Sequence, residues 1–161
     1  MPTYDRDALH AQLKRHEGYR DKLYLDSEGI LTVGTGHALG SIPLPGNARG
    51  ALGIPGVMDR AFPPEVLEAL FLHDAAEAEQ QVQTLAHLRG VDFEALAPQR
   101  QQALVNMCFQ MGPQRLGDFR RMWIALAAGD FDEAAREALD SRWAEQTPGR
   151  AVEVSSMIQG S

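Results

Sequence analysis

The apolar positions at the start of the chain predict a helix. Leu9, Leu13 and His16 recur at helical spacing. Asp5 or Asp7 can cap the first turn, since an aspartate side chain accepts hydrogen bonds from the unpaired backbone N–H groups there. We therefore expect a helix that runs from Asp5 to His16.

The pattern then changes to that of a β-hairpin. The runs Leu23–Leu25 and Ile30–Val33 are rich in strand-forming residues. Between them, Asp26–Gly29 predicts a reversal, because Asp and Ser bond their own backbone and Gly tolerates positive φ. Gly34 and Gly36 should let the backbone bend or approach another group closely.

Residues 38–62 are rich in Gly and Pro. We expect a loop there, with at most a short helical turn or a strand near its start. A loop of this length in a compact domain is often functional. It forms one wall of a binding cleft or is a tolerated insertion, and both interpretations stay open.

A long helix is predicted after this loop. Pro63 and Pro64 suit a first helical turn, and the helix should continue to about Ala86. It has one apolar stripe, and its acidic positions are interpreted as a solvated face without metal-ligand spacing. The stripe contains Leu67, Leu70, Phe71, Ala78, Val82 and Leu85, and the acids are Glu65, Glu68, Asp74, Glu77 and Glu79.

The rest of the chain has helical patterns throughout. The segment Pro98–Met111 is apolar on nearly all sides, which is typical of a core helix, and Gly112 with Pro113 should stop it. Four more helical segments are expected. They are Phe119–Ala128 closed by Gly129, Phe131–Leu139 behind a capping box of Asp130 and Glu133, a short turn or helix at Arg142 and Trp143, and a last helix to about Ile158 with Thr147 as its N-cap and Pro148 in its first turn.

Composition limits the classes of function. A chain of 161 residues is long enough for one domain with a sizeable core. A formal net charge of −7 argues against nucleic-acid binding, which depends on Lys and Arg at phosphates. Cys108 is the single cysteine, so no intramolecular disulfide can form, and we interpret it as a buried small hydrophobic residue.

Neither a secretory signal nor a membrane span is evident. The first residues lack an apolar region, and no segment is long enough to cross a bilayer. We expect synthesis and folding in a cytoplasm. The histidines at His10, His16, His73 and His87 show no metal-ligand spacing, and no metal site is expected.

Three groups near the start of the chain could act together chemically. Glu17 ends the first predicted helix, Asp26 lies at the predicted turn, and Thr32 lies on the second predicted strand. One carboxyl of such a pair can protonate a leaving oxygen while the other holds an attacking water. Spacing alone is weak evidence, and taken by itself it favours a solvated helix end and a turn aspartate.

Several motifs resemble a known family in the same order along the chain. The stretch Glu17–His37 has the pattern E-G-x-R-x-x-x-Y-x-D-x-E-G-x-x-T-x-G-x-G-H. The stretches Ala103–Gly112, Asp132–Ala135 and Ser141–Ala151 follow it. Together they resemble the phage-type lysozymes, the T-even phage endolysin group of glycoside hydrolase family 24. The resemblance covers most of the chain, and residues 38–62 match least.

This resemblance implies an α+β, lysozyme-like fold with two lobes. The small N-terminal lobe with the β-hairpin would cover about residues 1–62, the interlobe helix about 63–86 and the helical C-terminal lobe about 87–161. It implies a muramidase that cuts the β-1,4 bond between N-acetylmuramic acid and N-acetylglucosamine in peptidoglycan, with inversion. It implies no metal and no cofactor.

The resemblance also implies catalytic roles. Glu17 would be the general acid, Asp26 the base or water holder, and Thr32 a group that orients the water. For inversion, the two carboxyls should stand roughly 6.5–9.5 Å apart. His37 matches a family position beside the site, and a structural role in the hairpin is as consistent with the sequence.

Four residues of the C-terminal part match family positions at the substrate cleft. Arg150 would face the catalytic acid, and an ion pair with Glu17 would clamp the lobes until substrate enters. Arg142 would lie at the cleft mouth, or it is a surface charge. Phe109 and Gln110 would line the lower cleft, although a core role for Phe109 is as consistent.

One residue departs from the family pattern, and another is interpreted as part of the core. Glu153 stands where we would expect a basic residue, so the C-terminal lobe should bind glycan more weakly. Trp143 is interpreted as a core residue rather than a sugar platform.

The resemblance, together with the lack of an export signal, implies an endolysin for host lysis, released through a holin pore. We expect a monomer that acts on peptidoglycan, with neither nucleic acid nor stable membrane association. It would stay in the host cytoplasm until release and then act in the periplasm and cell wall. Two alternatives stay open: a lytic transglycosylase, and a non-catalytic wall-binding or phage tail domain.

Overall fold

A computed structural model describes residues 1–25, 31–38 and 61–160. Most of these residues are helical, and one small antiparallel sheet lies near the start of the chain. The predicted combination of a mostly helical chain with a small hairpin sheet is confirmed. The described part of the chain contains no helix that is both long and apolar enough to cross a membrane.

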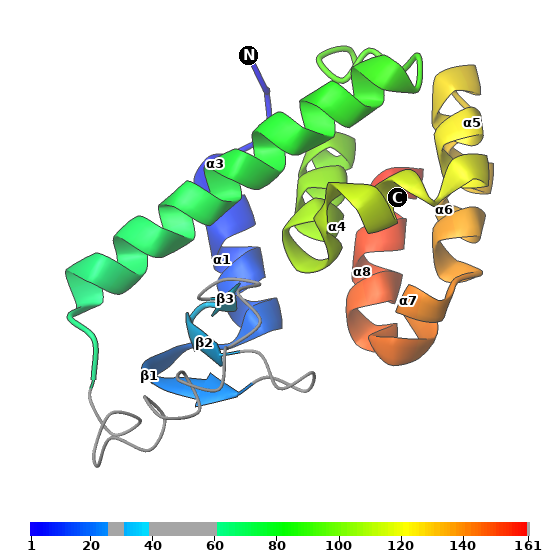
Figure 1. Cartoon of the computed structure of the whole chain (residues 1–161). Coiled ribbons are helices and arrows are strands. Elements are labelled where there is room, and N and C mark those ends of the chain that lie inside the picture. Colours follow the sequence, from blue (N-terminus) through cyan, green and yellow to red (C-terminus); the bar gives the residue numbers. More distant parts are fainter. Residues whose placement is uncertain (26–30, 39–60, 161) are drawn as a thin grey trace. The chain divides into compact units, whose positions relative to one another are not determined.

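The elements follow one another along the chain as Figure 1 labels them. They are α1 (Arg6–Glu17), β1 (Arg20–Leu25), β2 (Leu31–Gly34), β3 (His37–Ala38), α3 (Pro64–Leu88), α4 (Pro98–Gly117), α5 (Arg120–Ala128), α6 (Phe131–Leu139), α7 (Arg142–Gln146) and α8 (Pro148–Gln159).

The chain forms two compact units. One comprises Met1–His10 with Ala75–Ser161, and the other comprises Ala11–Asp74. Both divisions fall inside helices, α1 and α3. The first ten residues therefore group with the C-terminal helices, whereas the lobe boundaries expected from the sequence stay a prediction.

Local signals begin and end helix α1 as predicted. The Asp5 carboxylate accepts hydrogen bonds from the backbone N–H groups of Asp7, at 2.9 Å, and Ala8, at 3.2 Å. After the last helical residue, Glu17, the chain reaches Gly18 with a φ of 73°. This left-handed conformation suits glycine and turns the chain out of the helix toward β1.

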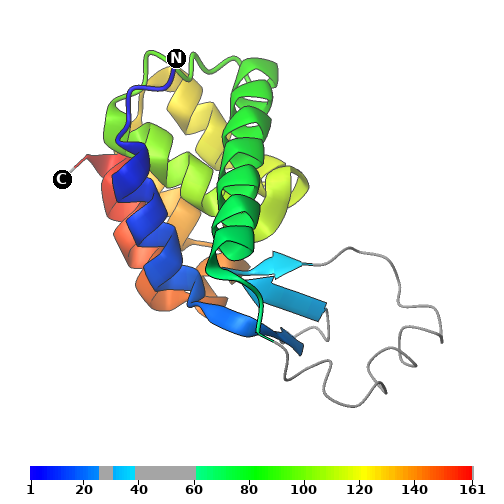
Figure 2. The ribbon, with the colours of Figure 1, turned by 90° about the vertical axis from the view of Figure 1, so that its left-hand side faces the viewer.

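The strands β1, β2 and β3 form one antiparallel sheet in that order (Figure 2). Tyr24 lies opposite Thr32 and Leu25 opposite Leu31, with an irregularity toward the start of β1. The pairing confirms the hairpin strands, and the predicted turn at residues 26–29 lies outside the described residues. Of the predicted loop 38–62, the structure describes only its two ends.

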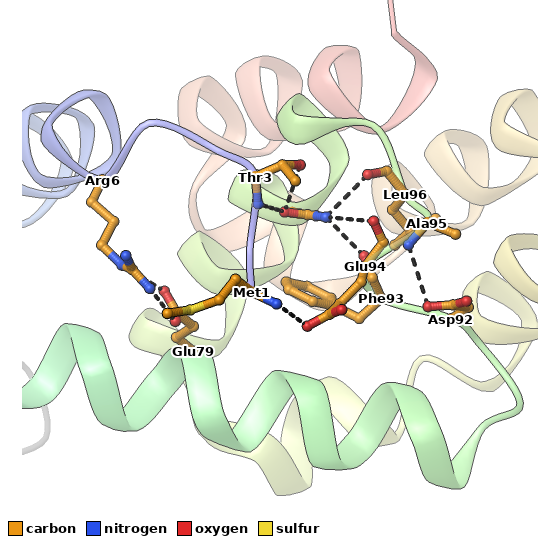
Figure 3. Close-up of polar contacts among 10 residues, drawn as sticks. Met1, Thr3, Arg6, Glu79, Asp92, Phe93, Glu94, Ala95 and Leu96 are labelled. Atoms are coloured by element: carbon orange, nitrogen blue, oxygen red, sulfur yellow. Dashed lines mark hydrogen bonds and ion pairs between the residues drawn. The ribbon is translucent and has the colours of Figure 1, made fainter.

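Three side chains fix the start of the chain to α3 within one unit. The guanidinium of Arg6 donates to both carboxylate oxygens of Glu79, at 2.9 and 3.2 Å (Figure 3). The Tyr4 hydroxyl donates to the same carboxylate. Burial, then the bond to Glu79, raises the pKa of Tyr4. The interpretation of Glu79 as part of a solvated face is therefore wrong, because the folded first residues cover it; its side chain is 14% exposed.

Helix α4 departs from its predicted end. Gly112, at φ 82° and ψ 165°, interrupts the helix, but Pro113 then begins a further helical stretch to Gly117. The predicted stop at Gly112 and Pro113 is thus a kink. Proline fits this position because its fixed φ suits a first helical turn and its missing N–H is not needed there.

The predicted core character of α4 is confirmed. Leu104, Val105 and Met107 are fully buried. Cys108 is also buried, and burial followed by the charge of Glu77 raises the pKa of its thiol to about 12. A thiol held protonated in this way is a packing residue, as predicted.

Local signals in the following helices are mostly confirmed. Gly129 ends α5 at φ 72°, and the Asp130 side chain accepts from the backbone N–H of Glu133 at the start of α6. Thr147 precedes α8 as predicted, but its hydroxyl donates to the Trp143 carbonyl at 3.0 Å and caps no N–H group of α8. A carbonyl of α7 thus competes with the start of α8 for the Thr147 side chain, and a cap prediction based on α8 alone does not consider this competitor.

Candidate functional site

The predicted acid, Glu17, lies where a helix end meets a strand turn. It is the last residue of α1 and is partly buried. A Cβ atom built at Gly36, in the turn between β2 and β3, would stand 3.3 Å from its Oε2 and 3.6 Å from its Cδ. The backbone of this turn therefore packs directly against the Glu17 carboxyl.

The predicted water-orienting residue, Thr32, is buried in the sheet of the same unit. Its side chain is 3% exposed, and it pairs with Tyr24 on β1 and Ala38 on β3. Asp26, the predicted base, lies outside the described residues. The residue before it, Leu25, pairs with the residue before Thr32, which is Leu31.

His37 begins strand β3 and pairs with Val33. The His37 backbone therefore lies in the sheet, as its predicted structural role in the hairpin requires. A chemical role for the imidazole stays a prediction.

In the other unit, Arg150 on α8 is held by Asn106 on α4. The guanidinium donates to the Asn106 side-chain oxygen at 2.9 Å and to its backbone carbonyl at 3.2 Å. Arg150 is 8% exposed and Asn106 is fully buried. A buried guanidinium requires such acceptors, since burial without a partner is strongly unfavourable. The sequence analysis missed Asn106, although an asparagine inside an apolar helix was a usable signal.

Gln110 is held in the same way by Trp143. The indole N–H donates to the Gln110 Oε1 at 2.6 Å, and the Trp143 ring meets Phe119 edge to face with ring centres 6.2 Å apart. Trp143 is 8% exposed, which confirms it as a core residue. The indole hydrogen bond also gives Trp143 a second role, because this bond fixes the orientation of the Gln110 amide, which is predicted to bind substrate.

The two other predicted substrate residues are accessible. Phe109 on α4 is partly exposed, so it contributes to the surface as well as to the core. Arg142 is the first residue of α7 and is exposed. Glu17, Thr32 and His37 belong to one unit, and the four residues of the C-terminal part belong to the other.

Along helix α3, one group of side chains has metal-ligand geometry that the sequence analysis did not predict. Ligand atoms of His73, Asp74 and Glu77 lie within 4.8 Å of one another. The His73 ring already pairs with Asp74 at 3.4 Å, and His73 and Glu77 are exposed. Exposed groups of this kind are common without an ion, and the arrangement supports no metal assignment.

Chemically, the Glu17 unit offers a positioned carboxyl and a buried hydroxyl, whereas the helical unit offers an oriented amide and a buried guanidinium. A carboxyl can donate a proton, and a hydroxyl can orient water. The amide can bind a sugar or peptide through hydrogen bonds.

Comparison with known proteins agrees with the motifs. The sequence model of the phage lysozyme family matches residues 14–157. A protein named probable T4-type lysozyme 1, from Dictyostelium discoideum, is 31% identical over 160 residues, which are 94% of this chain and 94% of that protein.

Two phage relatives are much longer. The pre-baseplate central spike protein Gp5 of Enterobacteria phage T4 is 33% identical over 171 residues, which cover 98% of this chain and 29% of the spike protein. The peptidoglycan hydrolase gp36 of Pseudomonas phage phiKMV is 32% identical over 140 residues, covering 87% of this chain and 14% of gp36. The chain thus spans a minor part of these two relatives.

The expected resemblance is therefore confirmed over nearly the whole chain. The family match contains the stretch from Glu17 to His37 and every predicted residue up to Arg150. The chain belongs to the phage lysozyme family.

Proposed function

We propose that the chain is a muramidase, which hydrolyses the β-1,4 bond between N-acetylmuramic acid and N-acetylglucosamine in peptidoglycan. One observation carries this proposal: the match to the phage lysozyme family includes every residue of the predicted site. The names of two relatives, a probable T4-type lysozyme and a peptidoglycan hydrolase, support the same reaction class.

The proposed reaction is a single displacement by water. Glu17 starts protonated and donates its proton to the glycosidic oxygen as the bond to the anomeric carbon breaks. Asp26 takes a proton from a water molecule, and the water oxygen attacks the anomeric carbon from the opposite face, so the configuration inverts. Thr32 orients that water through its hydroxyl.

The geometry around Glu17 supports its role as the acid. A general acid must keep its carboxyl within hydrogen-bond reach of the leaving oxygen. A freely rotating side chain would hold that position for less of the time. The end of α1 limits the backbone of Glu17, and the turn at Gly36 limits the carboxyl from one side. The buried position of Thr32 limits its hydroxyl similarly.

In the other unit, we propose that Gln110 and Phe109 contact the glycan or its peptide and that Arg142 contacts it from the surface. The bond from Trp143 supports the role of Gln110, because it orients the amide before substrate binds. The predicted ion pair between Arg150 and Glu17 would join residues of the two units and stays a prediction.

The simplest biological role is release through a holin pore and lysis of the host from inside. A second role is supported by the similarity to the spike protein Gp5 of phage T4: cell-wall cutting as part of a phage particle. The two roles differ in location. Immunodetection of the chain in purified particles would support the second, and its restriction to the lysate would support the first.

A turbidity assay on outer-membrane-permeabilised bacteria tests the reaction. We expect lysis by the wild type and a loss of at least about 100-fold for Glu17→Gln, which keeps the shape of the side chain and removes the proton. Gln114→Ala, at an exposed position of α4, is the control and should lyse normally. A fully active Glu17→Gln variant would reject the proposed acid.

Mass spectrometry of the released fragments separates the two enzyme classes. Hydrolysis leaves a reducing N-acetylmuramic acid end, whereas a lytic transglycosylase leaves an anhydro end. Binding to peptidoglycan without any release would instead indicate a non-catalytic wall-binding domain.

A further inference from the structure

We propose that Gly36 is a positioning residue for the Glu17 carboxyl: the missing side chain at Gly36 leaves the space in which that carboxyl rests. The inference depends on the proposed function for its catalytic consequence. The contact itself is a property of the fold and can be tested separately.

Strand pairing and backbone conformation restrict the turn that contains Gly36. Val33 on β2 pairs with His37 on β3, so only three residues reverse the chain. Gly34 and Gly36 have φ values of 64° and 73°, and Thr35 between them is 4% exposed. The pairing on both sides leaves this backbone little freedom to move away from a neighbouring group.

The contact with Glu17 extends along its side chain. A Cβ atom at Gly36 would meet Oε2 at 3.3 Å, Cδ at 3.6 Å and Cβ at 3.8 Å. The distance to Oε2 is shorter than ordinary van der Waals contact. An added methyl group would therefore displace the carboxyl by a few tenths of an ångström, because the carboxyl is the flexible end of its side chain and the turn is not.

Other glycines show that positive φ alone does not explain this position. Among the described glycines, Gly18, Gly90, Gly112 and Gly129 also have positive φ, but a Cβ there would meet nothing within 4 Å. Backbone conformation is sufficient to require glycine at those four sites. Gly36 combines the same conformation with direct contact to a carboxyl.

Gly34 provides a matched comparison in the same turn. It has a similar φ, and its Cβ would also meet a heavy atom at 3.3 Å, but that atom is Cδ2 of Leu67. Alanine at Gly34 and alanine at Gly36 should therefore strain the fold to a similar degree. Only the change at Gly36 moves the proposed proton donor.

The test compares Gly36→Ala with Gly34→Ala. For Gly36→Ala we expect kcat on soluble peptidoglycan fragments to fall at least about tenfold with KM within twofold of the wild type, because proton transfer depends steeply on donor position. Gly34→Ala should lose a similar amount of thermal stability and keep kcat. Equal kcat values for the two variants, measured where both are folded, would overturn the proposal.

A second variant covers the case in which Gly36→Ala does not fold. Asparagine tolerates positive φ better than alanine and places its Cβ at the same point. Gly36→Asn should thus fold and reproduce the loss of kcat. Retention of wild-type kcat by a folded Gly36→Asn variant would equally overturn the proposal.

A spectroscopic measurement separates this inference from the proposed function. The ¹³C resonance of the Glu17 side-chain carboxyl, assigned by its loss in Glu17→Gln, should shift in Gly36→Ala and stay unchanged in Gly34→Ala. If Glu17→Gln stays active while this shift is seen, the proposed acid is wrong and the contact is real. An unshifted resonance in Gly36→Ala would reject the contact whatever the activity.

Discussion

The surroundings of Glu17 and those of Arg150 show two ways of holding a functional side chain. At Glu17, the neighbouring group is a glycine backbone, and the carboxyl occupies space that a side chain would fill. At Arg150, the neighbouring group is Asn106, which supplies two acceptors to a buried guanidinium. The position of Glu17 is therefore sensitive to atoms added at Gly36, whereas Arg150 is sensitive to atoms removed from Asn106.

The difference follows from the elements involved. Short strands and a three-residue turn bring backbone close to Glu17, so glycine is needed there. The helices α4 and α8 pack through side chains, so polar groups between them must find side-chain partners. Arg150 and Gln110 are both held in this second way.

Removal of the Asn106 side chain, which accepts a hydrogen bond from Arg150, should have the largest effect on stability. We expect Asn106→Ala to lower the free energy of unfolding by about 2 kcal/mol, because the buried Arg150 guanidinium loses the side-chain acceptor of Asn106 and keeps only the backbone carbonyl there. Urea unfolding would measure it. The double variant with Arg150→Ala should be less destabilised than the sum of the single variants, and simple additivity would contradict the comparison.

Removal of the donor to Gln110 should have a smaller effect that extends to the substrate. Trp143→Phe keeps a ring and loses the N–H, and we expect about 1 kcal/mol of destabilisation together with a raised KM for peptidoglycan fragments.

Trp123 is a matched control for that prediction. It is 1% exposed, and its indole N–H donates to the Leu116 carbonyl at 2.9 Å. Trp123→Phe should lose comparable stability without a change in KM. If both variants changed KM equally, Gln110 would have no special part in binding.

A similar effect on stability, without an expected change in KM, is predicted at the Glu79 carboxylate that holds the first residues, and it depends on pH. Burial favours the neutral form of Glu79, but the hydrogen bonds from Arg6 and Tyr4 outweigh it and hold its pKa below the ordinary value of 4.5. The ionised carboxylate therefore stabilises the fold above about pH 4.5, and this contribution is lost as the pH falls through the lowered pKa.

Thermal unfolding of the wild type and Glu79→Gln would measure this contribution. We expect the wild type to be more stable by about 1 kcal/mol at neutral pH, with the difference shrinking toward pH 3. A difference that stayed constant across this range would show that the charge of Glu79 is not responsible.

Features that depend on adjacent residues could be predicted from the sequence. Asp5 and Asp130 cap their helices, and Gly129 ends α5, because each acts on backbone within four residues of itself. The motif around Glu17 and Thr32 was equally readable, since it lies within one continuous stretch. Thr147 stands at the predicted N-cap position of α8, but its hydroxyl bonds to a carbonyl of the preceding helix and does not cap α8.

Features that depend on distant residues could not be predicted. Glu79 resembles its acidic neighbours on α3, and only the position of Arg6 and Tyr4 distinguishes it. An asparagine inside an apolar helix indicated that Asn106 needs a partner, but only packing determined that this partner is Arg150, as it determined that Trp143 bonds Gln110.

The sequence by itself determined the order of the elements, the local caps and the family of this chain, because those depend on residue types at short and regular spacing. It also marked Gly36 as a site of unusual backbone. Only the tertiary structure decided that the space at Gly36 belongs to the Glu17 carboxyl, because the end of a helix and the turn of a sheet come together through packing, and nothing in their spacing along the chain requires it.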